Sequence, residues 1–239
     1  MTAAAVVADG VSAQTVIAQA SMRDELVSWD WISGRYDQIW DATLSHLWLT
    51  LFAVAVGFVI SVVLSALVLR WRRAYAPVTW ITGFFYTIPS LALFAFLVPI
   101  MGLGFYTAQV ALISYTLLIL IRNIVAGVDG VPDAVKEAAD GMGYTPLRRF
   151  FSVDLRLATP TIVAGVRIAT VTVVGLVTIT ALVGEGGYGV FILDGLRRTF
   201  PTPIVLGMTL SLMLAVTIDL LLVLVERLIT PWAHRRTVP

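Results

Sequence analysis

Few residues in this sequence have the type and spacing that catalysis requires. There is no cysteine, which excludes disulfides, thiolate metal sites and cysteine nucleophiles. The two histidines, His46 and His234, lie far apart and do not predict a metal site. The only lysine, Lys136, follows Val135, so the sequence contains no Gly-Lys-Ser/Thr phosphate-binding loop. Because no nucleophile–base set or carboxylate pair converges on one face, we expect neither an enzyme nor a cofactor bound by this chain.

A glycine-rich segment, residues 184–189, formally matches the GxGxxG pattern of dinucleotide sites. Such a site needs a preceding strand, whereas a long apolar stretch that includes Thr178 precedes this segment. Glycines also permit tight, close-packed turns. We therefore expect Gly184, Gly186 and Gly187 to form a bend on the outer side of a membrane, beside the opening of a polar pathway through it. Threonines such as Thr178 either line that pathway or bond back to their own helix.

Pro89 lies in the middle of another apolar stretch, between Thr87 and Ser90. Proline removes one helical hydrogen bond and can kink the helix. Irregular backbone at membrane depth is tolerated where it faces protein or a watery cavity. Thr87, Pro89 and Ser90 are thus candidate pathway residues, and a purely structural kink is the alternative. Phe84, Phe85, Tyr86 and Tyr188 are candidates for a cation-binding cage, but aromatic residues at the ends of membrane spans commonly anchor the span at the membrane–water interface, so we name no cage from the sequence.

The segment of residues 131–159, which lies between two apolar segments, is rich in charged residues, glycine and proline. Pro132 suits a first helical turn, and Asp133 is favoured beside a helix N-terminus. That helix would end at the glycines 141–143, and a second short helix would start at Pro146. The pattern predicts a compact two-helix projection. Its candidate functional residues are Glu137, Ala138, Ala139, Gly143, Arg148 and Arg149.

Composition places these segments in a membrane protein. Hydrophobic residues make up 59% of the 239 residues and charged residues 13%, whereas a soluble domain carries about 45–50% and about 25%. The net charge of +1 gives no indication of nucleic acid binding. Crossing the hydrocarbon takes roughly 20 helical residues. Five segments suit spans: residues 47–69, 77–100, 106–126, 160–183 and 204–225.

We therefore predict an all-α integral membrane fold with about five transmembrane helices. Residues 1–46 would form a leader and an interfacial helix, and residues 47–239 one transmembrane domain. An N-outside, C-inside orientation puts 12 of the 16 lysines and arginines inside, all but Arg23, Arg35, Arg197 and Arg198. It also makes residues 131–159 a cytoplasmic loop. Asp219, inside the fifth span, is expected to face protein and pair with an arginine, unless it lies at the interface.

The projection resembles a known family motif. Glu137-Ala138-Ala139, Gly143, Phe150, Val153, Leu155, Ala158, Pro160, Ala164-Gly165 and Arg167 are similar to the EAA loop of the transmembrane subunits of binding-protein-dependent ABC importers. In that family the loop docks in a groove of the ATPase subunit. This chain departs from the family at Leu155-Arg156, where Leu-Pro is common, so the start of the following helix could differ. The similarity spans about forty residues.

Further stretches are similar to permeases for glycine betaine, carnitine and choline. They are Thr87–Leu93, Ala181–Gly189 and Arg122-Asn123. The resemblance implies an osmoprotectant permease of the bacterial cytoplasmic membrane that works by alternating access. Its implied partners are two ATPase subunits that bind ATP and Mg²⁺, an identical or homologous second permease, an extracytoplasmic substrate-binding protein and membrane lipid. A methionine or other amino-acid permease, and a stand-alone channel or osmosensor, are the alternatives.

Overall fold

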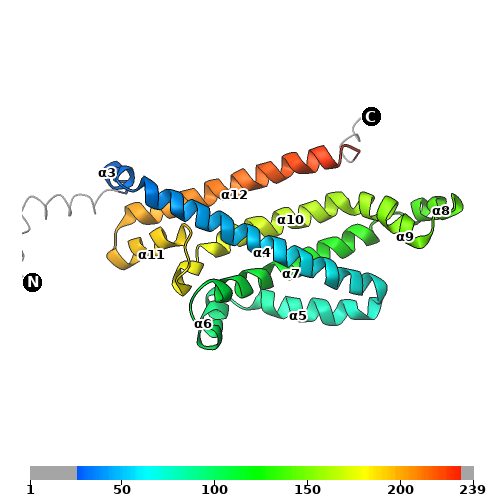
Figure 1. Cartoon of the computed structure of the whole chain (residues 1–239), viewed down its shortest axis with the longest axis horizontal. Helices are drawn as coiled ribbons and strands as arrows, with labels where there is room; N and C mark the ends of the chain where they lie inside the picture. The colour runs from blue at the N-terminus through cyan, green and yellow to red at the C-terminus, as the bar shows by residue number, and fades with distance from the viewer. Residues whose placement is uncertain (1–25, 233–239) are drawn as a thin grey trace, which may run out of the picture.

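A computed structural model describes residues 26–232, and all regular structure among them is helical. Four helices are long and apolar enough to cross a membrane: α4 (Tyr36–Arg70), α7 (Phe105–Asp129), the continuous helix Pro146–Val177 and α12 (Pro201–Ile229). A fifth candidate is the bent pair α5 (Tyr75–Thr87) and α6 (Ser90–Met101). The long helices run side by side along the length of the molecule (Figure 1). The expectation of an all-helical membrane fold with about five spans is confirmed.

The shorter elements connect these helices. α3 (Trp29–Ser33) precedes α4, and a 3₁₀ turn (Arg72–Ala74) leads into α5. α8 (Asp133–Gly141) and α9 (Pro146–Arg149) follow α7. A π-helical turn (Phe150–Asp154) then joins α9 to α10 (Leu155–Val177). A 3₁₀ turn (Thr180–Val183) and α11 (Gly189–Arg198) link α10 to α12.

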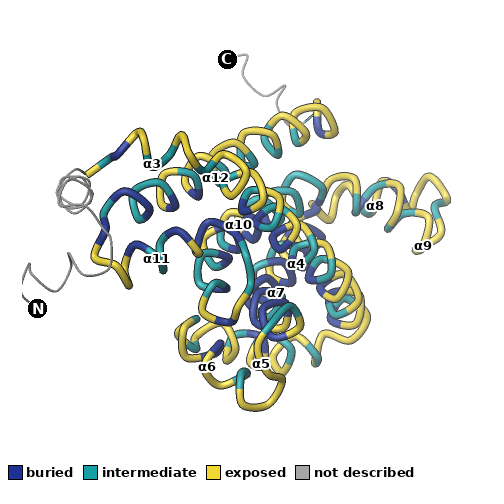
Figure 2. The backbone as a smooth tube through the Cα atoms, turned by 60° about the vertical axis from the view of Figure 1, so that its left-hand side comes forward, coloured by how far each residue is buried: buried dark blue, intermediate teal, exposed yellow. Residues whose placement is uncertain are grey.

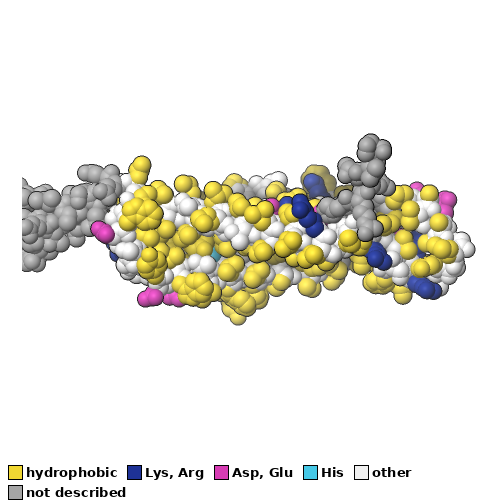
Figure 3. Space-filling model, turned by 90° about the horizontal axis from the view of Figure 1, so that it is seen from above, with side chains coloured by type: hydrophobic (Ala, Val, Ile, Leu, Met, Phe, Trp, Pro, Cys, Tyr) yellow, Lys and Arg dark blue, Asp and Glu magenta, His cyan; other side chains and the backbone are white. Residues whose placement is uncertain are grey.

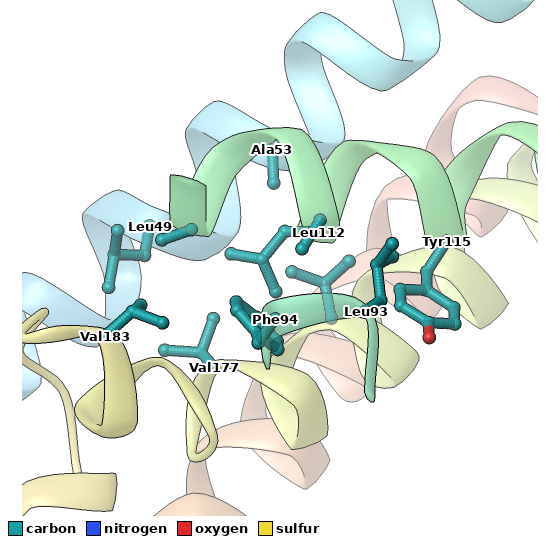
Figure 4. Close-up of a cluster of buried hydrophobic side chains, with 11 residues drawn as sticks. Leu49, Ala53, Leu93, Phe94, Leu112, Tyr115, Val177 and Val183 are labelled. Atoms are coloured by element: carbon teal, nitrogen blue, oxygen red, sulfur yellow. The ribbon is translucent and has the colours of Figure 1, made fainter. Parts of the chain in front are cut away.

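The helix α7 is the centre of the packing. More than half of its most apolar stretch is buried (56%), against 6% for α12, and Figure 2 shows α7 largely dark blue among its neighbours. Side chains of α4, α6, α7 and α10 meet in one apolar cluster, where Leu49, Phe94, Leu112 and Val177 pack together (Figure 4). Both faces of α7 are therefore occupied by other helices of the chain.

Small residues allow α4 and α10 to approach α7 closely. A Cβ atom built on Gly57 of α4 would lie 2.0 Å from Oγ1 of Thr116, and one on Gly165 of α10 would lie 2.4 Å from Cβ of Asn123. Such contacts suit helix association in lipid, where close packing replaces the hydrophobic effect. Ala53, Gly57, Ser61 and Ser65 recur every four residues along α4 and are all buried, so this stripe of small residues is used for packing inside this chain.

The predicted second span, residues 77–100, is not one helix. α5 ends at Thr87, α6 begins at Ser90, and the two helices are bent by 96°. Pro89 has no N–H, and Ile88 has an extended backbone. The Tyr115 hydroxyl donates a hydrogen bond to the Ile88 carbonyl, which would otherwise lack a helical partner. A sharp break, rather than a kink, therefore occurs at Pro89.

The bent pair still carries the chain from one end of the bundle to the other. Arg72, just before α5, forms an ion pair with Asp129 at the end of α7 (2.6 Å). Just after α6, the Gly104 N–H donates to the Val183 carbonyl at the far end of α10. Because α7 is about 37 Å long, residues 75–101 connect opposite ends of the bundle.

Two helices begin earlier than the sequence predicted. α4 is continuous from Tyr36, so no break occurs at residue 46, where an interfacial helix was expected to end. The fourth long helix starts before residue 160, because Pro160 lies inside α10 and α10 continues backwards into α9. Both extensions are amphipathic or charged, and hydropathy alone does not mark where such a helix starts.

The helix α12 is attached at its two ends. Its buried residues all lie in its first half and are Thr202, Pro203, Gly207 and Ser211; a Cβ on Gly207 would lie 2.8 Å from the carbonyl oxygen of Tyr188, just before α11. Further along, Arg167 of α10 binds Asp219 through Nε and Nη2 (3.0 and 3.1 Å) and Glu226 through Nη1 (3.1 Å). The expected pairing of Asp219 with an arginine is confirmed.

Gly57→Ala should destabilise the bundle, because the added methyl group must displace Thr116 from a packed interface. We expect a loss of roughly 1–3 kcal/mol, as for other overpacked cores, and a lower unfolding temperature of the purified protein in detergent. Gly175→Ala is the matched control, since nothing lies within 4 Å of a Cβ at that helical position. Equal stability of the two variants would contradict the packing described here.

Candidate functional site

The projection after α7 is a well-formed helix and turn. Asp133 lies in the first turn of α8, which ends at Gly141. The Tyr144 N–H donates to the Ala139 carbonyl while Gly143 adopts a left-handed backbone with φ of +80°. This is a Schellman arrangement, which favours glycine at the left-handed position. The role of Gly143 is thus to end α8 and reverse the chain.

The second half of the projection differs from the prediction. Thr145 accepts a hydrogen bond from the Arg148 N–H and caps α9, with Pro146 at the first helical position. The predicted start at Pro146 is therefore confirmed. The predicted separate second helix is wrong, because α9 continues through the π-helical turn into α10. The projection is rigidly joined to a long helix of the bundle.

Arg149 ties the projection to the base of α10. Its Nη1 donates to Asp140 of α8, and its Nε lies 3.6 Å from Oδ2 of Asp154. Asp154 is almost fully buried, and Ala139 of α8 is buried as well. Buried charges are stabilised by pairing, and their loss leaves an uncompensated partner. Arg149 and Ala139 therefore hold the projection in place and present little surface.

The remaining predicted residues form an exposed face. Glu137, Ala138, Gly143 and Arg148 are all exposed, and Arg148 lies over the Tyr144 ring at 4.6 Å. Sequence reasoning missed two apolar residues of this face, Met142 and Leu147, each 71% exposed. Their position beside glycine and proline in a polar segment was the available signal. Exposed apolar side chains rimmed by charges are typical of a protein interface.

The projection lies at the basic end of the molecule. α8 and α9 stand beyond the ends of α4 and α7, at the opposite end from α3 and α11 (Figure 1). Figure 3 shows the side of the bundle covered largely by hydrophobic side chains, with basic side chains gathered toward the end that carries the projection. This arrangement matches the charge distribution from which the orientation was predicted.

The candidate pathway residues fall into two separate groups. Thr87, Pro89 and Ser90 lie at the break between α5 and α6, and the Thr87 hydroxyl donates to the Phe84 carbonyl. Thr178 lies after α10, and its hydroxyl donates back to the Gly175 carbonyl. No hydrogen bond or ion pair within residues 26–232 joins the two groups, although their neighbours Ile88 and Ile179 pack against the same apolar cluster. The two groups therefore form no common hydrogen-bonded site in this part of the chain.

The glycine segment packs tightly against α4. Gly184 and Gly187 have positive φ angles of 84° and 87°. A Cβ on Gly186 would lie 2.8 Å from that of Ser45, and one on Gly187 would lie 3.2 Å from Nδ1 of His46. The requirement for glycine here is explained by backbone conformation and close approach to α4.

His46 anchors this segment, a role that the sequence did not indicate. It is fully buried, and its Nδ1 accepts a hydrogen bond from the Tyr188 N–H at 3.2 Å. Nε2 therefore carries the proton and donates to the Val174 carbonyl of α10 at 3.0 Å. Nearby, burial raises the pKa of the Glu185 carboxyl above its ordinary value. His46 thus joins α4, α10 and the start of α11.

Sequence comparison identifies a transport family. Residues 57–232 match the model for the binding-protein-dependent transport system inner membrane component. The choline transport system permease protein OpuBB of Bacillus subtilis (strain 168) is 35% identical over 194 residues, which cover 81% of this chain and 89% of that protein. The osmoprotectant import permease protein OsmW of Salmonella typhimurium is 33% identical over 194 residues, covering 79% and 90%.

Solved structures share the fold. An inward-facing form of the MetNI methionine ABC transporter aligns with a TM-score of 0.71 at 22% identity and covers 82% of this chain and 98% of its own. An amino acid ABC transporter with histidines aligns with a TM-score of 0.71 at 17% identity, covering 84% and 98%. At these identities the likeness concerns the fold alone.

Arg149→Gln should loosen the projection, because Asp140 and the buried Asp154 lose their cationic partner. We expect faster amide hydrogen exchange in α8 and unchanged exchange in α7, measured on the purified chain by mass spectrometry. Arg148→Gln is the matched control, since that arginine is exposed and contacts only the Tyr144 ring. Similar exchange in both variants would show that Arg149 does not fix the projection.

Proposed function

Because this chain belongs to the family of binding-protein-dependent transport system inner membrane components, we propose that it carries quaternary ammonium osmoprotectants across the membrane. The family makes it the permease subunit of an ABC importer, located in the inner membrane. The observation that supports the cargo is the similarity, at 33–35% identity, to permeases named for choline, glycine betaine, carnitine and osmoprotectants. These solutes share a trimethylammonium group.

The family also defines the type of partner. A permease of a binding-protein-dependent ABC importer works with an ATPase and a substrate-binding protein. Family members lack their own ATPase site, and we propose that this chain is likewise no enzyme and leaves ATP and Mg²⁺ to its partner. We further propose a complex with two ATPase subunits and a second permease, either a second copy of this chain or a homologue.

The exposed face of the projection is the proposed ATPase contact. Glu137 and Arg148 supply its charged side chains, Ala138 and Gly143 are small exposed residues between them, and Met142 and Leu147 supply apolar anchors. With the N-terminus outside and the C-terminus inside, this face lies in the cytoplasm. A displacement of the projection would move α10, because the helix is continuous through the π-helical turn. This is the kind of rigid-body shift that supports alternating access.

Amino-acid transport is the alternative cargo class. The two solved transporters of similar fold are named for methionine and amino acids. Their identity to this chain is 17–22%, lower than that of the osmoprotectant permeases. The exposed projection gives no support to a stand-alone channel, which would have no use for an ATPase contact.

Uptake measurements test the cargo. Cells lacking this chain should lose uptake of labelled choline, glycine betaine or carnitine after an osmotic upshift, and the wild-type chain should restore it. Methionine uptake should be unchanged, because its carrier would be a different permease. Loss of methionine uptake with normal osmoprotectant uptake would contradict the proposed cargo and favour the alternative.

Charge reversal at the projection tests the ATPase contact. Glu137→Lys together with Met142→Asp should abolish co-purification of the ATPase and uptake, because a charge and an apolar anchor of the contact are lost. Arg73→Glu is the control, an exposed charge at the same end of the molecule but outside the projection. Undiminished co-purification of the first variant would place the contact elsewhere.

A further inference from the structure

A groove of about 560 Å³ lies between α5 and α7, away from both the projection and the glycine segment. Trp80, Phe84, Tyr86 and Thr87 of α5 form one side of it, and Leu118 and Arg122 of α7 form the other. Trp80, Phe84 and Thr87 recur at helical spacings of four and three, which places them on one face, and Tyr86 follows Gly83 of the same lining by three residues. The groove therefore combines aromatic rings with a single cation.

One antiparallel register fixes how the two sides face each other. The pairs that define it are Arg72 with Asp129, Gly83 with Leu118, and Tyr86 with Tyr115. By the same register, Arg122 is level with Thr79 and adjacent to Trp80. Tyr86 lies about 10 Å further along the groove, at 1.5 Å per helical residue. The Arg122 side chain thus lies across the groove from Trp80, and the rings of Phe84 and Tyr86 follow along α5.

The α5 side of the groove, which carries the aromatic rings, favours a positive charge. Trp80 is 80% exposed and Phe84 64% exposed, so their ring faces are free to accept a ligand within residues 26–232. α5 also ends here at Thr87, and the C-terminal end of a helix carries a partial negative charge. Quaternary ammonium groups bind aromatic faces by cation–π attraction. A trimethylammonium group matches the α5 side of the groove.

The α7 side of the groove, which carries Arg122, favours a negative charge. Arg122 is exposed, and within the described part of the chain it makes no hydrogen bond or ion pair. It lies seven residues, or roughly 10 Å, before the end of α7. An arginine inside a membrane span usually faces protein or a water-filled cavity and pairs there with another polar group. Its planar guanidinium fits a carboxylate in a bidentate manner.

We propose that this groove binds zwitterionic quaternary ammonium carboxylates during translocation. The ammonium group lies against Trp80 and Phe84, and the carboxylate binds Arg122. This inference rests on the proposed function, and it adds a discrimination between cargoes. Glycine betaine and carnitine have both groups, whereas choline has the ammonium group and a neutral hydroxyl.

Arg122→Gln should change the preference between cargoes. We expect the transport rate of glycine betaine, relative to that of choline, to fall by roughly tenfold or more, because a hydrogen-bonded charge pair to the carboxylate is lost. The measurement uses the complete importer in proteoliposomes, with a saturating concentration of the cargo-loaded substrate-binding protein. The affinity of that protein for each cargo then does not set the transport rate. Arg73→Gln, an exposed arginine outside the groove, should leave the ratio unchanged.

Substitutions at Trp80 test the aromatic side of the groove. Trp80→Leu should slow both cargoes, whereas Trp80→Phe should retain most of the rate, because a ring face remains. An equal fall for both cargoes in Arg122→Gln would overturn the proposal. Arg122 would then bind lipid phosphate if the fall depends on anionic lipid in the vesicles, and it would serve folding if the fall does not. An unchanged ratio would overturn it as well. If the wild-type importer transports neither cargo, the proposed function itself fails.

Discussion

The close approach of α4 and α10 to α7 is the contact on which the other features depend. In a bilayer, lipid tails are as apolar as leucine, so helices associate through packing distance and hydrogen bonds. Gly57 and Gly165 remove the side chains that would hold the three helices apart. Once α7 is enclosed in this way, its two ends fix the positions of the projection at one end and the glycine segment at the other.

The helix that begins at Pro146 connects these two ends. It carries the projection at its start, and the Val174 carbonyl near its end accepts a hydrogen bond from His46. Between them, Arg167 holds Asp219 and Glu226 of α12. A rigid element with attachments at both ends and in the middle is suited to transmit a displacement. The π-helical turn at residues 150–154 is the irregular point of this element.

The break at Pro89 has the opposite character, because it interrupts a span. Non-helical backbone at membrane depth is tolerated where protein or water satisfies it, and Tyr115 satisfies the Ile88 carbonyl. The break turns α6 into the apolar cluster, where Phe94 is buried. The break also places the C-terminal end of α5, with its partial negative charge, at the groove between α5 and α7, beside the aromatic rings. One break in the chain therefore serves both the packing of α6 and the surface of the groove.

Composition and local sequence patterns were enough to assign the class of the protein. Its apolar content required a membrane, the apolar segments gave the number of spans, and the pattern from Glu137 to Arg167 gave the family. Asp219 was expected to find an arginine because an unpaired charge is costly there. The start of α9 at Pro146 followed from local helix chemistry, as did the end of α8 at the glycines. These features depend on composition or on neighbours in the sequence.

Features that depend on contacts between distant residues could be seen only in the folded chain. Hydropathy did not show that α4 begins at Tyr36 or that α9 continues into α10, since charged helical turns extend beyond an apolar stretch. Arg148 and Arg149 are adjacent and identical in type, yet only Arg149 meets Asp140 and Asp154. Likewise, a proline in an apolar segment permits a kink or a full break. The choice of a 96° bend follows from the packing of α6 and from the Tyr115 hydroxyl, which lies 27 residues from the carbonyl that it satisfies.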